Sequence, residues 1–329
     1  MNSMNETIHK VYLEAMNIAN LEPWETINDS EVFAIEHPVS HLLYFVQVVG
    51  KSQPLFGIQI SKGYEAYLRL QDWLKYGDSS IKANRLALYS LYYDFEPLQE
   101  IDAKRLSIAE VSSPTLKGWP RFRDFTPEYL PWHPSDEDFS ILELLLPQIR
   151  LMLQIAKTDP TSLSSPDGCL IRRLQQGIWH TEVQNRMPEE REKLSYLRPE
   201  QPQAIRELPS NSGATFEAIL GLSDVPFQTK VGERPFYPWI FLLIDAADGQ
   251  LLDYRLTARS ESFASVSEGF IEALAKAGYR PGEILVDTEM TQVILTGVCQ
   301  DLNIPVRKAT LEFGAKLLSL IQKKIATSA

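Results

Sequence analysis

The chain has 329 residues, of which 44% are hydrophobic, and its formal net charge is −11 at pH 7. This length predicts two domains of roughly 100–200 residues, each with enough apolar side chains for a packed core. The acidic charge argues against general nucleic-acid binding, which needs a basic surface, although residues 226–329 are nearly neutral with 11 basic and 12 acidic residues.

Residues 1–184 predict an α+β domain made of an antiparallel sheet with helices. Apolar residues recur at helical spacing near the start of the chain, and three apolar runs then follow as strands of a meander. Ser135 precedes three acidic residues and an apolar periodic run, which predicts a capped helix. The expected elements are helix 8–19, strands 32–35, 42–49 and 55–60, helix 64–74, strand 86–95, helices 102–111 and 136–157, and a hairpin of strands 169–174 and 178–183.

A polar stretch with four prolines follows, and residues 185–222 are therefore expected to form a linker. Residues 223–329 predict an α/β domain with a mixed sheet. Phe227–Val231 is interpreted as its first strand, and apolar runs on either side of Asp248-Gly249 predict a hairpin. The expected elements after that first strand are strands 236–244 and 251–256, helix 263–277, strand 284–287, helix 291–302, strand 304–307 and helix 311–325.

Targeting and metal-binding signals are missing from the sequence. There is no secretory signal pattern, and no apolar run approaches the 18 or so residues that cross a bilayer, so a cytoplasmic protein without membrane contact is expected. Cys169 and Cys299 form no CxxC motif, and the five histidines show no ligand spacing. No phosphate-binding glycine loop or hydrolase motif occurs, so neither a cofactor nor a metal ion is expected.

Motifs in both halves of the chain resemble an uncharacterised bacterial family of two modules that carries only domain-of-unknown-function labels. This resemblance covers most of the chain and implies an architecture, but no activity. The motifs are Trp24, Phe33–Pro38, Tyr44–Gly50, Gly118–Arg123 and Tyr129–Trp132 in the first module, and Tyr237–Pro238, Ile244–Asp245, Arg280–Asp287 and Leu302–Val306 in the second.

The second module is also similar, more distantly, to the ribonuclease H-like fold of nucleases and integrases. Its expected order of three strands, helix, strand, helix, strand and helix is the order of that fold. Nucleases of this fold hold two Mg²⁺ ions, about 3.5–4 Å apart, with carboxylates from the first strand, the fourth strand and usually the last helix. Asp287 matches the fourth-strand position and Asp245 is a candidate for another ligand, but a third ligand is missing. Alternatively, Asp245 shapes a turn and Asp287 caps the element that follows it.

Trp119–Pro134 is rich in aromatic residues and prolines. Aromatic side chains favour the centres of interfaces, so Trp119, Tyr129 and Trp132 are candidates for a binding surface if they are exposed. The alternative is an irregular segment that covers the core with its aromatic side chains buried.

The leading functional hypothesis is a non-catalytic, cytoplasmic protein that binds another protein or a second copy of itself, because the sequence contains no complete catalytic set. One alternative is a metal-dependent nuclease built on Asp245 and Asp287, which requires their carboxylates to lie within about 6–7 Å of each other. Another is a small-molecule sensor that binds its ligand between the modules.

Overall fold

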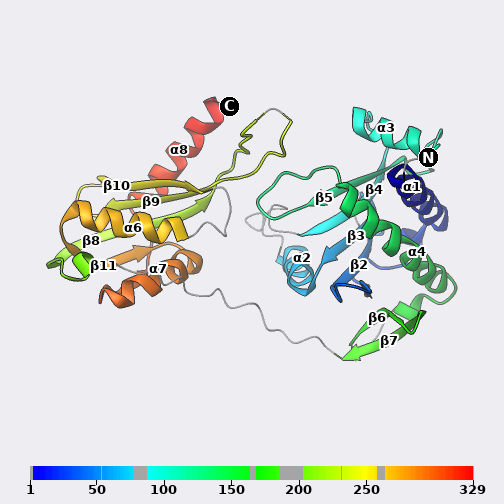
Figure 1. Cartoon of the computed structure of the whole chain (residues 1–329), viewed down its shortest axis with the longest axis horizontal. Coiled ribbons are helices and arrows are strands. Elements are labelled where there is room, and N and C mark those ends of the chain that lie inside the picture. The colour runs from blue at the N-terminus through cyan, green and yellow to red at the C-terminus, as the bar shows by residue number, and fades with distance from the viewer. Residues whose placement is uncertain are drawn as a thin grey trace. The chain divides into compact units, whose positions relative to one another are not determined.

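The chain forms two compact units in the computed structural model, which describes residues 3–52, 54–76, 87–163, 168–185, 203–230, 232–257 and 264–328 (Figure 1). The first unit comprises Met1–Pro127 and Pro131–Arg191, and the second comprises Glu128–Leu130 and Glu192–Ala329. Each unit contains a mixed sheet with helices. The α+β character and the two modules expected from the sequence are therefore confirmed.

The first unit is built on a seven-stranded sheet in the order β5-β4-β3-β2-β1-β6-β7. β1 to β5 form an antiparallel meander, whereas β6 pairs with β1 in parallel. The sheet is therefore mixed rather than purely antiparallel. A long helix follows β5, and the next strand, β6, lies beside β1 on the side away from β2. The strands are β1 (Val32–Glu36), β2 (Leu43–Val49), β3 (Phe56–Lys62), β4 (Leu88–Asp94), β5 (Trp119–Phe125), β6 (Gly168–Gln175) and β7 (Ile178–Asn185).

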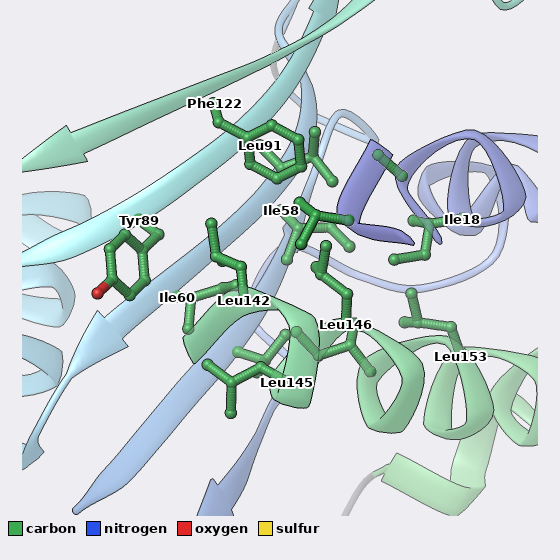
Figure 2. Close-up of a cluster of buried hydrophobic side chains, with 14 of the residues drawn as sticks. Ile18, Ile58, Ile60, Tyr89, Leu91, Phe122, Leu142, Leu145, Leu146 and Leu153 are labelled. Atoms are coloured by element: carbon green, nitrogen blue, oxygen red, sulfur yellow. The ribbon is translucent and has the colours of Figure 1, made fainter. Parts of the chain in front are cut away.

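Two long helices share the main core of this unit with one face of the sheet. Along the strands, alternate side chains point to this face, and along each helix the apolar residues recur every three or four positions. Figure 2 shows leucines of α4, such as Leu142 and Leu146, directed toward Ile58 and Leu91 of the sheet. The helices are α1 (Ser3–Leu21), α2 (Tyr64–Tyr76), α3 (Glu100–Ile108) and α4 (Asp136–Thr158), with short 3₁₀ turns at Pro23–Glu25 and Pro160–Leu163.

By length and composition, α4 could cross a membrane, which corrects the expectation that no run of that kind occurs. Its most apolar window is 44% buried inside the first unit, where its leucines complete the core. Core helices of folded domains meet the same length and composition criteria, so these criteria alone assign α4 no membrane role.

The second unit is a five-stranded sheet in the order β10-β9-β8-β11-β12. β8, β9 and β10 are antiparallel neighbours, whereas β11 and β12 run parallel to β8. Helices α6 and α7 pack on one face and α8 on the other. The strands are β8 (Ser210–Leu222), β9 (Trp239–Asp245), β10 (Leu251–Thr257), β11 (Arg280–Val286) and β12 (Val306–Lys308), and the helices are α5 (Gln203–Arg206), α6 (Ala264–Ala277), α7 (Glu289–Asp301) and α8 (Gly314–Ser328).

β8 corrects the interpretation of the sequence at two points. Residues 210–222 are the central strand of the second sheet, whereas the sequence predicts a linker over 185–222. The described part of the expected first strand Phe227–Val231, residues 227–230, is not a strand, and Phe227 forms an isolated bridge with Phe236. β8 begins with small polar residues that are typical of loops, so its sequence does not predict a strand. Its pairing with β9 and β11 holds it in the extended conformation. Residues 186–202 of the expected linker lie outside the described residues.

Candidate functional site

Asp245 and Asp287 lie apart in the sheet of the second unit. Asp245 pairs with Phe216 of β8, whereas Asp287 follows Val286, which pairs with Ala218 of the same strand. The two acids are thus two strands and three residues apart, a Cα separation of roughly 14 Å at about 4.8 Å per strand and 3.3 Å per residue. The carboxylate pair required by the nuclease alternative is therefore not formed by these two residues.

Asp245 stabilises the turn between β9 and β10. Its Oδ1 accepts a hydrogen bond from the amide of Ala247 at 2.9 Å. The hydroxyl of Tyr279 lies 3.5 Å from its Oδ2. The side chain therefore shapes the hairpin, as one of the two sequence interpretations predicts.

Asp287 lies where β11 ends and α7 begins. The hydroxyl of Thr291 donates to its Oδ1 at 3.3 Å, and Thr288 is the N-cap of the helix, accepting from the amide of Thr291 at 3.2 Å. Burial raises the pKa of Asp287, and the hydrogen bonds and the nearby Lys308 only partly oppose this rise. Asp287 therefore contacts Thr291 at the start of the helix, but the N-cap is Thr288, one residue later than the capping interpretation places it.

Glu217, in the middle of β8, is the acidic residue that the sequence interpretation missed. It is only 3% exposed. Its Oε1 accepts from the amide of Glu312 at 2.7 Å, and its Oε2 accepts from the amides of Phe313 at 2.9 Å and Gly314 at 2.7 Å. These amides begin α8, where backbone N–H groups have no partner within the helix and favour a negative charge. Glu217 therefore caps α8 from a different element of the fold.

Glu217 and Asp287 lie on neighbouring strands. Leu285 pairs with Glu217, and Asp287 follows Leu285 by two residues, so both acids belong to the sheet face that α8 covers. In the part of the chain that the structure describes, no group of three His, Cys, Asp or Glu side chains could hold a metal ion. A two-metal site would also have to displace the three amides that already bind Glu217.

The aromatic candidates of the first unit, Trp119 and Trp132, are half-buried. Trp119 begins the edge strand β5 and packs against the core. Trp132 forms a backbone bridge with Asp124 of the same strand, with hydrogen bonds of 2.7 and 2.9 Å. Residues 119–125 are therefore a strand rather than part of an irregular segment, and neither indole forms an exposed contact surface.

Tyr129, the third aromatic candidate, lies in the short segment Glu128–Leu130, which belongs to the second unit. Its ring is half-buried and packs against Phe236 at 6.1 Å, with the guanidinium of Arg234 over it at 5.4 Å. The adjacent Glu128 accepts a hydrogen bond from the indole nitrogen of Trp239 at 2.7 Å. Tyr129 therefore has a packing role within the second unit, separate from the two tryptophans.

A buried ionic cluster joins α3 to β5 in the first unit. Asp102 of α3 is fully buried, and its two oxygens accept from Arg123 of β5 at 3.0 and 2.8 Å. The Nδ1 of His133 lies 3.2 Å from the Arg123 guanidinium and 3.5 Å from Asp102. Burial and the Arg123 charge lower the pKa of His133 to about 4. Each charge of this Asp–Arg pair is compensated, as a buried ion pair requires.

A second polar cluster lies where β3, β4 and β5 meet the start of α4. Lys62 donates to Asp124 and lies 3.7 Å from Asp138, and its ammonium is 3.8 Å from the centre of the Tyr89 ring. Tyr89 donates to Asp138 at 2.5 Å. Burial would raise the pKa of Asp138, but the hydrogen bonds from Tyr89 and Ser135 outweigh it and the net shift is downward. This cluster therefore joins the sheet to the helix through satisfied contacts.

In a comparison with known proteins, the two parts of the chain match the models of different domain families. Residues 9–172 match the family model of a domain of unknown function, DUF7309, and residues 202–319 match that of another, DUF6930. No curated protein matches the chain. Among solved structures, it is similar to a chain of the simian T-cell lymphotropic virus intasome in complex with PP2A regulatory subunit B56 gamma, with 14% identity over 41% of this chain and 44% of that one. The TM-score is 0.24, which does not establish a shared fold.

Proposed function

We propose that this chain, whose two parts match domains of unknown function, is a non-catalytic binding protein and that its second unit is a ribonuclease H-like scaffold. The order of elements from β8 onward supports the scaffold. Three strands, a helix, a strand, a helix, a strand and a final helix follow one another, with the first strand at the centre of the sheet. The correct first strand, β8, restores this order after Phe227–Val231 is set aside.

The contacts of Glu217 carry the non-catalytic part of the proposal. A nuclease of this fold needs a first-strand carboxylate that is free to bind metal ions. Glu217 occupies the first strand, but its oxygens bind three amides at the start of α8. Moving this carboxylate to a metal would leave these amides without their acceptor, and the amide of Gly314, which is buried, would cost about 1–3 kcal/mol. The acid therefore stabilises the fold in the place where a nuclease would use it for chemistry.

The binding part of the proposal is supported by exposed apolar side chains at a sheet edge. Tyr254 and Leu256 of β10 are 41% and 52% exposed. Apolar side chains on an edge strand commonly mark a site of strand pairing or protein contact.

Cleavage assays test the non-catalytic proposal directly. The full chain, incubated with single- and double-stranded DNA and RNA in the presence of Mg²⁺ or Mn²⁺, is expected to cleave none of them. The variant Glu217→Gln is expected to behave like the wild type in this assay. Metal-dependent cleavage that Glu217→Gln abolishes would contradict the proposal.

The same residue is expected to matter for stability. Glu217→Ala removes the acceptor of the buried Gly314 amide at the start of α8 and should lower the free energy of unfolding by about 1–3 kcal/mol in denaturant titrations. Glu283→Ala is the matched control, because this β11 acid forms an ion pair with the exposed Arg307. Its effect should stay below about 0.5–1 kcal/mol, as for surface ion pairs. Equal effects of both variants would argue against a capping role for Glu217.

A further inference from the structure

The two edges of the second sheet differ in how they meet solvent. Among the described residues, β10 pairs with β9 alone, and Leu251, Tyr254 and Leu256 on this edge strand are exposed. The opposite edge, β12, is only three residues long and carries Arg307 and Lys308. Short, charged edges resist pairing with other strands, whereas a longer edge with apolar side chains favours it. β10 is therefore the edge suited to bind another strand.

Opposite charges flank the centre of β10. Asp253 and Arg255 stand on either side of Tyr254, with Arg255 Nε 3.0 Å from Asp253 Oδ2. Arg255 also donates to Glu272 of α6 at 2.6 Å. A Cβ atom at Gly269 of α6 would collide with both Arg255 and Asp253. The glycine within this helix thus lets the charged pair lie close to α6, on one face of the sheet.

We propose that β10 pairs in antiparallel fashion with β10 of a second copy of this chain, about a twofold axis through Tyr254. This inference names a partner for the binding role proposed above and rests on that role. In this register Tyr254 lies opposite Tyr254 of the second copy. Asp253 lies opposite Arg255 of the second copy, and Arg255 opposite its Asp253. Opposite charges and aromatic pairs directly across two strands stabilise an antiparallel pair.

The charges select this register over its neighbours. A shift of the axis to Asp253 places this acid opposite its own copy, and a shift to Arg255 places two guanidinium groups opposite each other. Like charges directly across two strands destabilise the pair. Moving the axis by one residue shifts the pairing of the two strands by two residues. A shift of the pairing by one residue, with the axis between two residues, is excluded as well, because it places side chains of different sheet faces opposite each other. Among these registers, the axis through Tyr254 is the one that pairs opposite charges and keeps side chains of the same face opposite each other.

The irregular start of β10 limits the length of the pair. The register with β9 shifts between Leu251 and Asp253, so the regular part of the strand is Asp253–Thr257. A short ladder of this kind has few backbone hydrogen bonds, and the expected dimer is reversible and depends on protein concentration.

Sedimentation velocity of the full chain tests the proposal, with charge reversals as the probe. The wild type is expected to show a monomer–dimer equilibrium. Arg255→Asp places acids opposite acids, and Asp253→Arg places bases opposite bases, so each variant alone should dimerise about tenfold more weakly or worse. An equimolar mixture of the two variants restores opposite charges at both positions. The mixture should therefore form heterodimers with near wild-type affinity.

Arg307→Asp, a charge reversal on the other edge strand, is the matched control and should leave the equilibrium unchanged. Circular dichroism checks that each variant is folded, and Tyr254→Lys is a second, surface-exposed probe that should also weaken the dimer. A wild type that is monomeric at every concentration would overturn the inference, as would a mixture that stays monomeric. The cleavage assays judge the non-catalytic proposal separately, so dimerisation with cleavage would overturn only that proposal.

Discussion

His133 shows how one half-buried side chain can make stability depend on pH. Desolvation is the largest cause of its lowered pKa, and the Arg123 charge adds to it, although Asp102 acts in the opposite direction. The pKa falls from 6.5 to about 4, so the folded protein binds fewer protons at this residue than the unfolded chain does between these values. Stability contributed by neutral His133 is therefore present above about pH 6.5 and is lost as the pH falls toward 4.

This shift predicts a measurable loss of stability in acid. Between pH 7 and pH 4, His133 should account for a decrease of at most about 3 kcal/mol in the free energy of unfolding, at about 1.4 kcal/mol per pKa unit. Urea titrations at several pH values measure the slope. His133→Gln removes the titrating group and should flatten the profile in this window. The same change at the exposed His180 should keep the wild-type slope, and identical slopes for wild type and His133→Gln would contradict the assignment.

At the residue scale, roles defined by local contacts could be predicted and roles defined by distant contacts could not. The turn at Asp245 and the helix start beside Asp287 involve neighbours within a few residues, and the sequence interpretations identify both places, although the N-cap is Thr288. Glu217 instead binds amides nearly one hundred positions away, at the start of α8. No pattern within its own segment identifies such a partner.

The start of α4 is an element whose local sequence signal agrees with the structure. Ser135 accepts from the amide of Asp138 at 3.2 Å, and Asp138 accepts from the amide of Ser135 at 2.8 Å, which forms a capping box. The acidic first turn also complements the helix dipole.

Removal of this cap should destabilise the first unit moderately. Ser135→Ala is expected to lower the free energy of unfolding by about 1 kcal/mol and to speed hydrogen exchange in the first turn of α4. Ser140→Ala lies in the same helix, where the exposed hydroxyl donates to the carbonyl of Asp136. This control should change stability by less than about 0.5 kcal/mol. If the two variants behave alike, the capping box contributes nothing beyond helix propensity.

Two strands, β5 and β8, were not recognised from the sequence. β5 contains Pro120 and three charged residues, which disfavour a strand unless it lies at an edge and its charges find partners. The structure supplies both conditions, since β5 is an edge strand and Arg121 and Arg123 pair with Asp94 and Asp102. The longer helices and the β9–β10 hairpin are predicted within a few residues, whereas the short helix α5 lies in the expected linker.

At the scale of the whole molecule, three residues from the first half of the chain complete the second unit. Glu128, at a positive φ of 71°, is buried and accepts from the indole of Trp239. Its backbone carbonyl also accepts from the amide of Tyr237 at 2.7 Å. The second unit is therefore not formed by a continuous segment of the chain.

Glu128→Ala should destabilise the second unit although the residue lies in the first half of the sequence. Loss of the acceptor for the buried indole is expected to cost about 1–3 kcal/mol, seen as faster hydrogen exchange in β8 and β9. Glu128→Gln keeps an acceptor oxygen and should recover part of this loss. Glu233→Ala, at an exposed residue of the same unit, is expected to have no measurable effect on exchange. If Glu128→Ala leaves the hydrogen-exchange protection of β8 and β9 unchanged, the hydrogen bond between Glu128 and Trp239 does not stabilise the second unit.

The amino-acid sequence by itself determined the two-module α+β organisation, the longer helices, the meander of β1 to β3 and the β9–β10 hairpin. These features depend on periodicity, caps and turns, which act over a few residues. Only the tertiary structure decided that 210–222 is a central strand, that Glu217 caps α8, and that Asp245 and Asp287 lie too far apart to share a metal site. Strand pairing and burial bring together residues distant in the chain, and their partners become known only once the sheets have formed.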